Sequence, residues 1–380
     1  MPRLVVSVSG HGFGHVAQTA PILNLLHERM PQLRLTVRSA VPLAHLRSRI
    51  RAPFEHLPDN SDIGMVMSSA LDVRVEESRA AYRALHADWE ARVAEEAHLL
   101  YDLGSDLVLS NVGHLPLAGA QRAGIANAAL CSLNWFDIFR HYCVQPVHAS
   151  TGSARTEKEY PSTKPSVLSK AEGSGRTEDE KIAAQIHDCY ANADAFLRLT
   201  PGMVMEHLPN LVPVAPIAEV GKNRRDELDR RLGLSKGERL VLISLGGIAS
   251  RLPIECWPRI EGVRWLVQQS WQVSHPDAVI IELLPLDFGD LLASSDALLC
   301  KPGYGSFVEA ACSGVPVLYV SRADWPEAPA LIEWLQRHGL CREVSREALE
   351  RGNLAKALEE IRDAPRAGPV IPEGAKQVVD

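Results

Sequence analysis

The stretch VVSVSGHGFGHVAQTAPILNLL, residues 5–26, decides the fold of the N-terminal half. It opens with an apolar run typical of a buried parallel strand. A turn with three glycines and two histidines follows, and then apolar residues recur every three or four positions, as they do along a helix. Gly12 and Gly14 would let backbone amides approach a ligand closely. Because such a turn lies where a doubly wound sheet binds its ligands, it is a candidate binding loop.

Two common classes of nucleotide-binding turn do not fit this loop. The dinucleotide fingerprint G-x-G-x-x-G fails, because the glycines alternate and His15 stands where the third glycine is needed. A dinucleotide oxidoreductase also needs an acidic residue after its second strand, and TVRSAVP, residues 36–42, has none. No Lys-Ser or Lys-Thr pair follows, which excludes a P-loop. A tight turn that binds nothing, with His15 as a packed or capping residue, stays an alternative.

Strand-like and helix-like segments alternate along most of the chain, which predicts an α/β fold with parallel sheets. A length of 380 residues favours two domains. Residues 151–181 are rich in Ser, Thr, Gly, Lys and Glu and predict a flexible insertion. Prolines cluster between positions 201 and 216, where a boundary is expected. We predict an N-terminal domain over residues 1–215, a C-terminal domain over 216–365 and a tail over 366–380.

Composition narrows the class of partner and the compartment. The formal net charge is -7, and the acidic and basic residues are interspersed, which argues against a nucleic-acid partner. Seven widely spaced cysteines without a CxxC pair fit neither a disulfide framework nor a zinc site, so we expect reduced thiols. No signal peptide or membrane-spanning run is visible. These features predict a soluble cytoplasmic protein.

A second glycine-rich turn lies in LLCKPGYGSFVEAACSGVPVLYV, residues 298–320. The pattern is strand, turn, short helix and strand. Free backbone amides at a helix N-terminus form an anion site suited to a diphosphate, and here they would come from Gly303, Tyr304, Gly305 and Ser306. The Ser306 hydroxyl would add a donor, and Lys301 a positive charge. Glu309, one turn further on, could reach a ribose diol.

A third turn and the histidine of the first complete the candidate site. VLISLGG, residues 241–247, ends a strand in Gly246 and Gly247 and offers a second set of amides at the same sheet edge. His15 would lie in the first turn of its helix, where the helix dipole disfavours the imidazolium. A neutral imidazole near a cleft can take a proton from a substrate hydroxyl. Together the three turns describe a nucleotide cradle with a candidate base.

These residues resemble the GT-B nucleotide-sugar glycosyltransferases, and in particular the glycosyltransferase-like domain that precedes the kinase in L-arabinokinases. The chain is also similar, more distantly, to the family 28 enzymes that transfer N-acetylglucosamine to a lipid-linked acceptor. The likeness spans nearly the whole chain. It rests on the SGHGFGH opening, Gly124-Ile125, Asn134, Trp135 and Asp137, the stretch Asp194 to Gly202, and Lys301 to Ala310.

The resemblance implies two Rossmann-like domains with parallel sheets that face each other across a cleft. The nucleoside diphosphate sugar would be a co-substrate on the C-terminal domain, and the acceptor, a small molecule, a lipid-linked molecule or a protein, would bind the N-terminal domain. Neither a metal nor another cofactor is expected. By position, His15 matches the family's base and Asp137 is the candidate for its orienting carboxylate. Asp324 or Glu327 would touch hydroxyls of the donor sugar.

The sequence therefore predicts a metal-independent, inverting glycosyltransferase. Two alternatives remain at this stage. One is a module that binds a nucleotide sugar for sensing or regulation without catalysis, because the likeness is to a domain fused to a kinase. The other is a nucleotide-sugar epimerase, which would need several carboxylates in the cleft.

Overall fold

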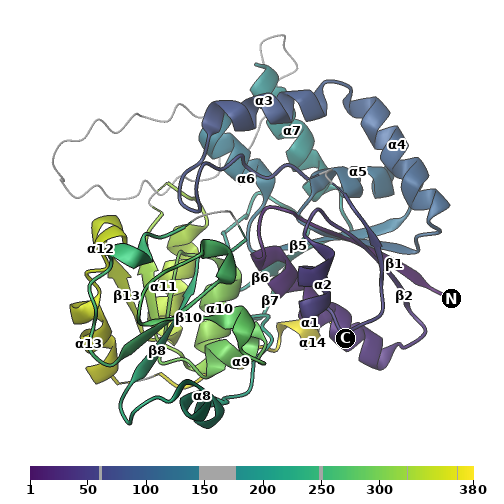
Figure 1. Cartoon of the computed structure of the whole chain (residues 1–380). Helices are drawn as coiled ribbons and strands as arrows, with labels where there is room; N and C mark the ends of the chain where they lie inside the picture. Colours follow the sequence, from purple (N-terminus) through teal and green to yellow (C-terminus); the bar gives the residue numbers. More distant parts are fainter. Residues whose placement is uncertain (60–61, 145–176, 248–250, 323, 366) are drawn as a thin grey trace.

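The structure is a computed structural model, and it describes residues 1–380 apart from 60–61, 145–176, 248–250, 323 and 366. Two α/β domains lie side by side, each built on one sheet with helices packed on its faces (Figure 1). All the pairs of neighbouring strands in both sheets are parallel. The predicted α/β fold with two Rossmann-like domains is confirmed.

The N-terminal sheet has seven strands in the order β3-β2-β1-β4-β5-β6-β7. Its strands are mostly short runs of buried apolar residues, as expected of strands that are covered by helices on both faces. They are β1 Arg3–Val8, β2 Arg34–Arg38, β3 Glu55–Leu57, β4 Leu107–Asn111, β5 Ala126–Cys131, β6 Ala195–Leu199 and β7 Leu211–Val214.

The C-terminal sheet has six strands in the order β10-β9-β8-β11-β12-β13. Its central strands are fully buried and supply much of that domain's core. The six are β8 Arg239–Ser244, β9 Val263–Val267, β10 Ala278–Ile280, β11 Ala297–Cys300, β12 Val317–Val320 and β13 Cys341–Val344.

Helices lie between many of the consecutive strands and form the crossover connections that parallel strands need. In the N-terminal domain they are α1 Gly14–Arg29, α2 Leu43–Arg49, α3 Val75–His86, α4 Trp89–Asp102, α5 His114–Ala123, α6 Trp135–Phe139 and α7 Glu178–Ala191. Those of the second domain are α8 Arg225–Leu232, α9 Phe288–Ala293, α10 Tyr304–Ser313, α11 Ala328–His338, α12 Arg346–Arg351 and α13 Ala355–Asp363. A last helix, α14 Gly374–Val379, follows them.

The strand orders explain why the glycine-rich turns form one site. In each sheet the order of the strands reverses once, between β1 and β4 in the first and between β8 and β11 in the second. At such a reversal the connections leave on opposite faces, so a crevice opens beyond the carboxyl ends of the two strands. The turn after β1 and the turns after β8 and β11 therefore each start at a crevice.

Two patterns of apolar residues are each divided between two elements. Those that recur every three or four positions from Tyr82 to Leu100 belong to two helices, α3 and α4. The apolar run 279–284 is a strand only to Ile280, and a 3-10 turn follows at Ile281–Leu283. Most of the insertion predicted over 151–181 lies outside the described residues. Its last part is helical: the Thr177 hydroxyl caps α7 by accepting from the Glu180 N–H, and the Glu180 carboxylate accepts from the Thr177 N–H.

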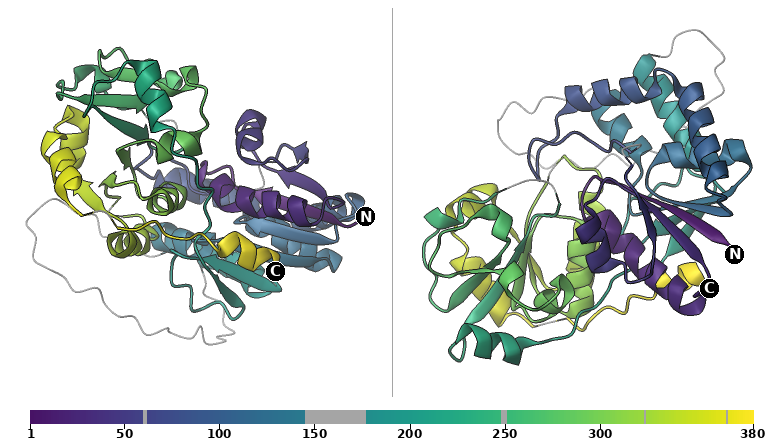
Figure 2. Two further views of the ribbon diagram at one scale, coloured as in Figure 1. Left: turned by 90° about the horizontal axis from the view of Figure 1, so that it is seen from below. Right: turned by 45° about the vertical axis from the view of Figure 1, so that its right-hand side comes forward.

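The tail after residue 365 ends on the opposite domain. The chain runs from α13 across to the N-terminal domain, where α14 packs beside α1 (Figure 2). The Gly374 N–H donates to the Pro216 carbonyl, and Gln377 accepts from the Ala215 N–H at 2.7 Å. An ion pair between Arg29 and Asp380 adds to this contact. The end of the chain thus ties the two domains together, which the proline and glycine content of the tail did not suggest.

Two further observations bear on the sequence-based predictions. All seven cysteines are free, in agreement with reduced thiols. Among the described residues, no helix combines the length and the apolar character that crossing a membrane would require.

The docking of α14 can be tested at Gly374. A Cβ atom at this position would lie 2.1 Å from the Ala215 carbonyl oxygen and 2.6 Å from Ile217 Cγ1. We expect Gly374→Val to push α14 away and to lower the free energy of unfolding by roughly 1–3 kcal/mol, measured by chemical denaturation. Gly368→Val is the control, because a Cβ there meets nothing within 4 Å. Equal stability of the two variants would contradict the docking contact.

Candidate active site between the domains

One cleft is lined by all three glycine-rich turns. The space that it outlines is about 680 Å³, and this volume includes space open to solvent. Residues 11–15 and 303–306, which belong to two of these turns, therefore face one cleft. The residues that line the cleft are His11, Gly12, Phe13, Gly14, His15, Gln18, Ser132, Leu133, Gly246, Gly247, Lys301, Pro302, Gly303, Tyr304, Gly305, Ser306, Arg322, Trp325 and Glu327.

The first turns of α1 and α10 are in direct contact across the domain boundary. A Cβ atom on Gly305 would lie 3.0 Å from Ala17 Cβ and 3.6 Å from the Cα atom of Gly14. A Cβ atom on Gly247 would overlap the Phe13 ring at 2.7 Å. Glycine at these positions therefore allows the closest approach of the two domains, and a larger side chain would force them apart.

Both helices present uncapped N-termini to the cleft. No side chain among the described residues caps α1 at Phe13 or α10 at Gly303. The first N–H groups of a helix have no partner within the helix, and they carry the positive end of its dipole. Backbone N–H groups of the Tyr304–Ser306 turn are thus available to an anion, as the sequence predicted.

His15 is held by the end of the neighbouring strand at the reversal point of the first sheet. Strand β4 pairs with β1, and its last residue, Asn111, lies beside Val8. The Asn111 side chain therefore reaches the first turn of α1, where its Oδ1 atom lies 2.7 Å from His15 Nδ1. Both side chains are buried.

A chain of hydrogen bonds determines which nitrogen of His15 carries the proton. The Glu327 carboxylate accepts from the Ser132 hydroxyl at 2.6 Å, and that hydroxyl accepts from Gln18 Nε2 at 2.9 Å. Gln18 Oε1 in turn accepts from Asn111 Nδ2 at 2.9 Å, which leaves Asn111 Oδ1 facing His15. An amide oxygen only accepts hydrogen bonds. His15 Nδ1 is therefore the protonated nitrogen, and Nε2 keeps its lone pair.

Burial keeps the His15 ring neutral. It lowers the pKa of His15 from 6.5 to about 4, and the charge of Lys301 acts in the same direction, while the hydrogen bond to Asn111 opposes both. The His11 ring is stacked on Trp325 and packs edge-on against Trp135, and burial and nearby positive charge lower its pKa well below the ordinary value. Both imidazoles are uncharged at neutral pH.

The charges that line the cleft are unbalanced. Burial and the neighbouring Arg322 lower the pKa of Lys301 to about 8, so its ammonium is still largely protonated at neutral pH. Arg322 is also cationic and buried. Among the described lining residues, Glu327 is the single carboxylate, and it already accepts hydrogen bonds from Ser132 and from Trp325 Nε1. The cleft therefore has two cations and two helix N-termini but one carboxylate, and this excess of positive charge suits an anionic ligand.

Comparisons with known proteins agree with this architecture. No protein-family model matches the chain. The chain is 23% identical to the L-arabinokinase of Arabidopsis thaliana over 355 residues, which are 93% of this chain. It spans about a third (31%) of the length of that relative.

Solved glycosyltransferases have the same architecture over almost the whole chain. The glycotransferase of kitacinnamycin superposes with a TM-score of 0.58 at 14% identity, covering 99% of this chain and 93% of the other. UGT2 of Phytolacca americana, solved with UDP-2fluoro-glucose and pterostilbene, superposes with a TM-score of 0.54 at 15% identity, covering 100% and 92%. The chain has the GT-B fold.

Within this GT-B fold, three predicted site residues are not in the cleft lining. Asp137 does not orient His15. Its carboxylate accepts from Asn134 at the start of α6 and lies 3.7 Å from His207 Nε2, whereas Asn111 occupies the position behind His15. The prediction was wrong because the resemblance suggested a carboxylate in this role, and this chain has an amide there.

Glu309 and Asp324 also lie elsewhere. The Glu309 carboxylate is buried and forms an ion pair with Arg49 of α2, on the other domain, so it is not placed to meet a ribose in the cleft. Asp324 is exposed, and of the two acidic candidates only Glu327 lines the cleft. Tyr304 lines it through its backbone turn, while its hydroxyl accepts from the Ile217 N–H.

The structure adds residues that the motifs did not indicate. Asn111 could have been found from the strand order, since it ends the strand that pairs with β1 at the reversal point. Gln18 and Ser132 carry no signal in a single sequence, because their role depends on a hydrogen-bonded chain that crosses three elements. Arg322 lies two residues before Asp324, and the resemblance implied a role only for the acidic residues of this stretch.

The contact between His15 and Asn111 predicts the effect of a charge at position 111. In Asn111→Asp a carboxylate would face His15 Nδ1 and stabilise the imidazolium, so the pKa of His15 should rise from about 4 toward its ordinary value. An NMR titration of the imidazole resonances measures it. Asn127→Asp, on β5, is the control, because Asn127 bonds the Ile125 carbonyl. An unchanged His15 titration in Asn111→Asp would contradict the assigned contact.

Proposed function

We propose that this chain is a glycosyltransferase that moves a sugar from a nucleoside diphosphate donor to an acceptor hydroxyl. One observation carries the proposal: the uncharged His15, whose Nε2 keeps its lone pair, lies in the same cleft as the uncapped N-terminus of α10. The likeness to solved glycosyltransferases, one of them with a UDP sugar bound, supports the same class. The acceptor would enter from the N-terminal domain, which carries His15.

The proposed reaction inverts the configuration at the transferred carbon. His15 Nε2 takes the proton of the acceptor hydroxyl, and the oxygen of that hydroxyl attacks the sugar carbon from the face opposite the diphosphate. The bond from that carbon to the diphosphate oxygen breaks, and its electron pair leaves with the phosphate. The N–H groups of the 303–306 turn and the Lys301 ammonium would stabilise the growing charge, each well-placed donor by about 3 kcal/mol. We propose that the transfer proceeds without a metal ion.

A binding module without catalysis is the second candidate, and one observation favours it. The partner of His15 Nδ1 is an amide, and a base with a pKa of about 4 removes a proton from a hydroxyl less readily than one near neutrality. Such a module would bind the nucleotide sugar without transferring or hydrolysing it. The epimerase alternative needs several carboxylates, and Glu327 stands alone among the described lining residues.

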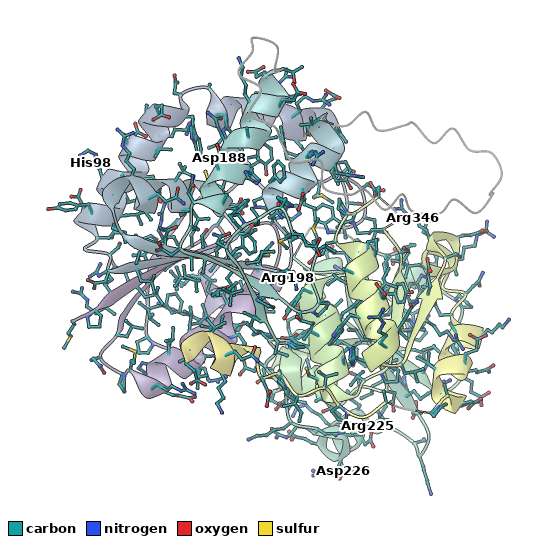
Figure 3. All side chains as sticks on the ribbon, turned by 180° about the vertical axis from the view of Figure 1, so that it is seen from behind. His98, Asp188, Arg198, Arg225, Asp226 and Arg346 are labelled. Atoms are coloured by element: carbon teal, nitrogen blue, oxygen red, sulfur yellow. The ribbon has the colours of Figure 1, made fainter. Side chains whose placement is uncertain are left out.

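Replacement of His15 separates catalysis from binding. We expect His15→Ala to lower sugar transfer, or slow donor hydrolysis, by about 100-fold or more, because a general base typically contributes at least that factor. Nucleotide binding should survive, measured as a thermal shift with UDP, TDP or GDP; a ligand at 100 times its Kd adds about 2.7 kcal/mol. His98→Ala, at the outer edge of the molecule on α4, is the control (Figure 3).

Three outcomes distinguish the candidates. Loss of turnover with binding retained supports the base. Equal loss of binding and turnover in His15→Ala would mean that His15 contacts the donor or supports the fold. Donor binding by the wild type without transfer or hydrolysis of any donor would favour the binding module.

The pH dependence of kcat/KM gives an independent test of the base. Because the pKa of His15 in the fold is about 4, the base stays deprotonated on acidification through pH 6 and pH 5. We expect kcat/KM to fall only as the pH approaches about 4, with recovery of activity on return to pH 7 as the check for unfolding. An acid limb near pH 6.5, the ordinary value for histidine, would contradict the assignment.

A further inference from the structure

Arg322 is a buried cation, and part of its hydrogen-bonding capacity is not used within the described chain. It follows β12 by two residues, lines the cleft and is only 3% exposed. Its Nε and Nη2 atoms have no hydrogen-bond partner among the described residues. Buried polar nitrogens are nearly always bonded, so two free ones on a single guanidinium require an explanation.

The packing of Arg322 leaves its edge free. The guanidinium lies over the Trp325 ring, with its central carbon 4.2 Å from the ring centroid. Stacking occupies a face of the planar group, whereas its N–H bonds point outward in the plane. Trp325 is itself fixed, because its Nε1 donates to Glu327 at 3.2 Å. The stacked ring therefore holds a donor fork in place, and such a fork matches a carboxylate or a phosphate in two parallel hydrogen bonds.

No carboxylate of the described chain pairs with this fork. Glu327 is the one acid among the described lining residues, and its two oxygens already accept from Ser132 and Trp325. The side chain of Asp324 is exposed, and its backbone carbonyl accepts from the Tyr142 hydroxyl. The charges of Asp324, Glu327 and Asp72 act on Arg322 from a distance, and none of these carboxylates forms an ion pair with it among the described contacts. A buried cation without a hydrogen-bonded partner costs stability, and a folded protein has little reason to retain one unless it serves a ligand.

The position of Arg322 indicates which part of a donor it would meet. Lys301 follows β11 and Arg322 follows the neighbouring strand β12, so the two cations lie at adjacent strand ends. The 303–306 turn and Lys301 are placed for the diphosphate. With the diphosphate at this turn, we take the sugar to extend toward the next strand end, where Arg322, Trp325 and Glu327 line the same cleft.

We propose that Arg322 binds an oxyanion at the sugar end of the donor, either the sugar-linked phosphate or a carboxylate carried by the sugar, as in a uronic acid. This inference rests on the proposed function, since it takes a nucleoside diphosphate sugar to be the ligand. It names a specificity residue of the cleft and limits the class of donor.

The test compares variants at position 322 with three ligands. Arg322→Met removes the charge at similar length, and Arg322→Lys keeps the charge without the planar fork. Arg346→Met is the control, because Arg346 is an arginine of the same domain that pairs with Asp72 outside the cleft (Figure 3). Binding is measured by calorimetry with the diphosphate that gives the largest thermal shift among UDP, TDP and GDP, and with its glucose and glucuronate derivatives.

The expected result is a Kd that rises about 10-fold to 100-fold in Arg322→Met, since a charge-assisted hydrogen bond is lost. A rise for all three ligands assigns the anion to the phosphate, and a rise for the glucuronate derivative alone assigns it to the carboxylate. Unchanged affinities for all three would overturn the inference while leaving the proposed function intact. A wild type that binds none of the ligands would instead overturn the proposed function, and the inference with it.

The melting temperature without ligand distinguishes binding from structure. A residue that serves a ligand is not needed for folding, so Arg322→Met should melt at the same temperature as the wild type or higher. A lower melting temperature in Arg322→Met and in Arg322→Lys, with binding reduced in proportion, would assign the side chain to the fold and overturn the inference.

Discussion

Helices α1 and α10 touch through their first turns, and the chemistry of the cleft depends on this contact. Gly305 fits against Ala17 and Gly14 with almost no space left, so the two uncapped N-termini are brought to the same crevice. Each terminus carries partial positive charge, and Lys301 adds a full one. A concentration of positive charge at this point is unfavourable unless a ligand with negative charge occupies the cleft.

Hydrogen bonds between polar side chains also link the two domains at this contact. The hydrogen-bonded chain from Glu327 through Ser132, Gln18 and Asn111 to His15 begins on the C-terminal domain and ends on the N-terminal one. Its first step exists only while the domains are together. The position of the proton on His15 therefore depends on Glu327, which lies on the C-terminal domain. A ligand that moves the two domains relative to each other would also affect the hydrogen bonds that orient His15.

The fold and the three turns could be predicted because each depends on local pattern. A buried strand, a glycine turn and a helix leave a clear sequence signal, and parallel strands bring such turns to one edge. Partners from distant elements were not predictable in the same way. Glu309 has the residue type and spacing expected for contact with a ribose, yet its carboxylate forms an ion pair with Arg49 from the other domain. Asp137 was chosen by resemblance, and strand order places Asn111 behind His15 instead.

The decisive experiment is a crystal structure with the nucleoside diphosphate selected by thermal shift. We expect the diphosphate to lie within hydrogen-bond distance of the backbone nitrogens of Gly303 to Ser306 and of Lys301 Nζ, with His15 Nε2 open to the space beside the sugar-linked phosphate. A diphosphate bound on another surface, or segments 10–15 and 303–306 separated from each other in the complex, would contradict it.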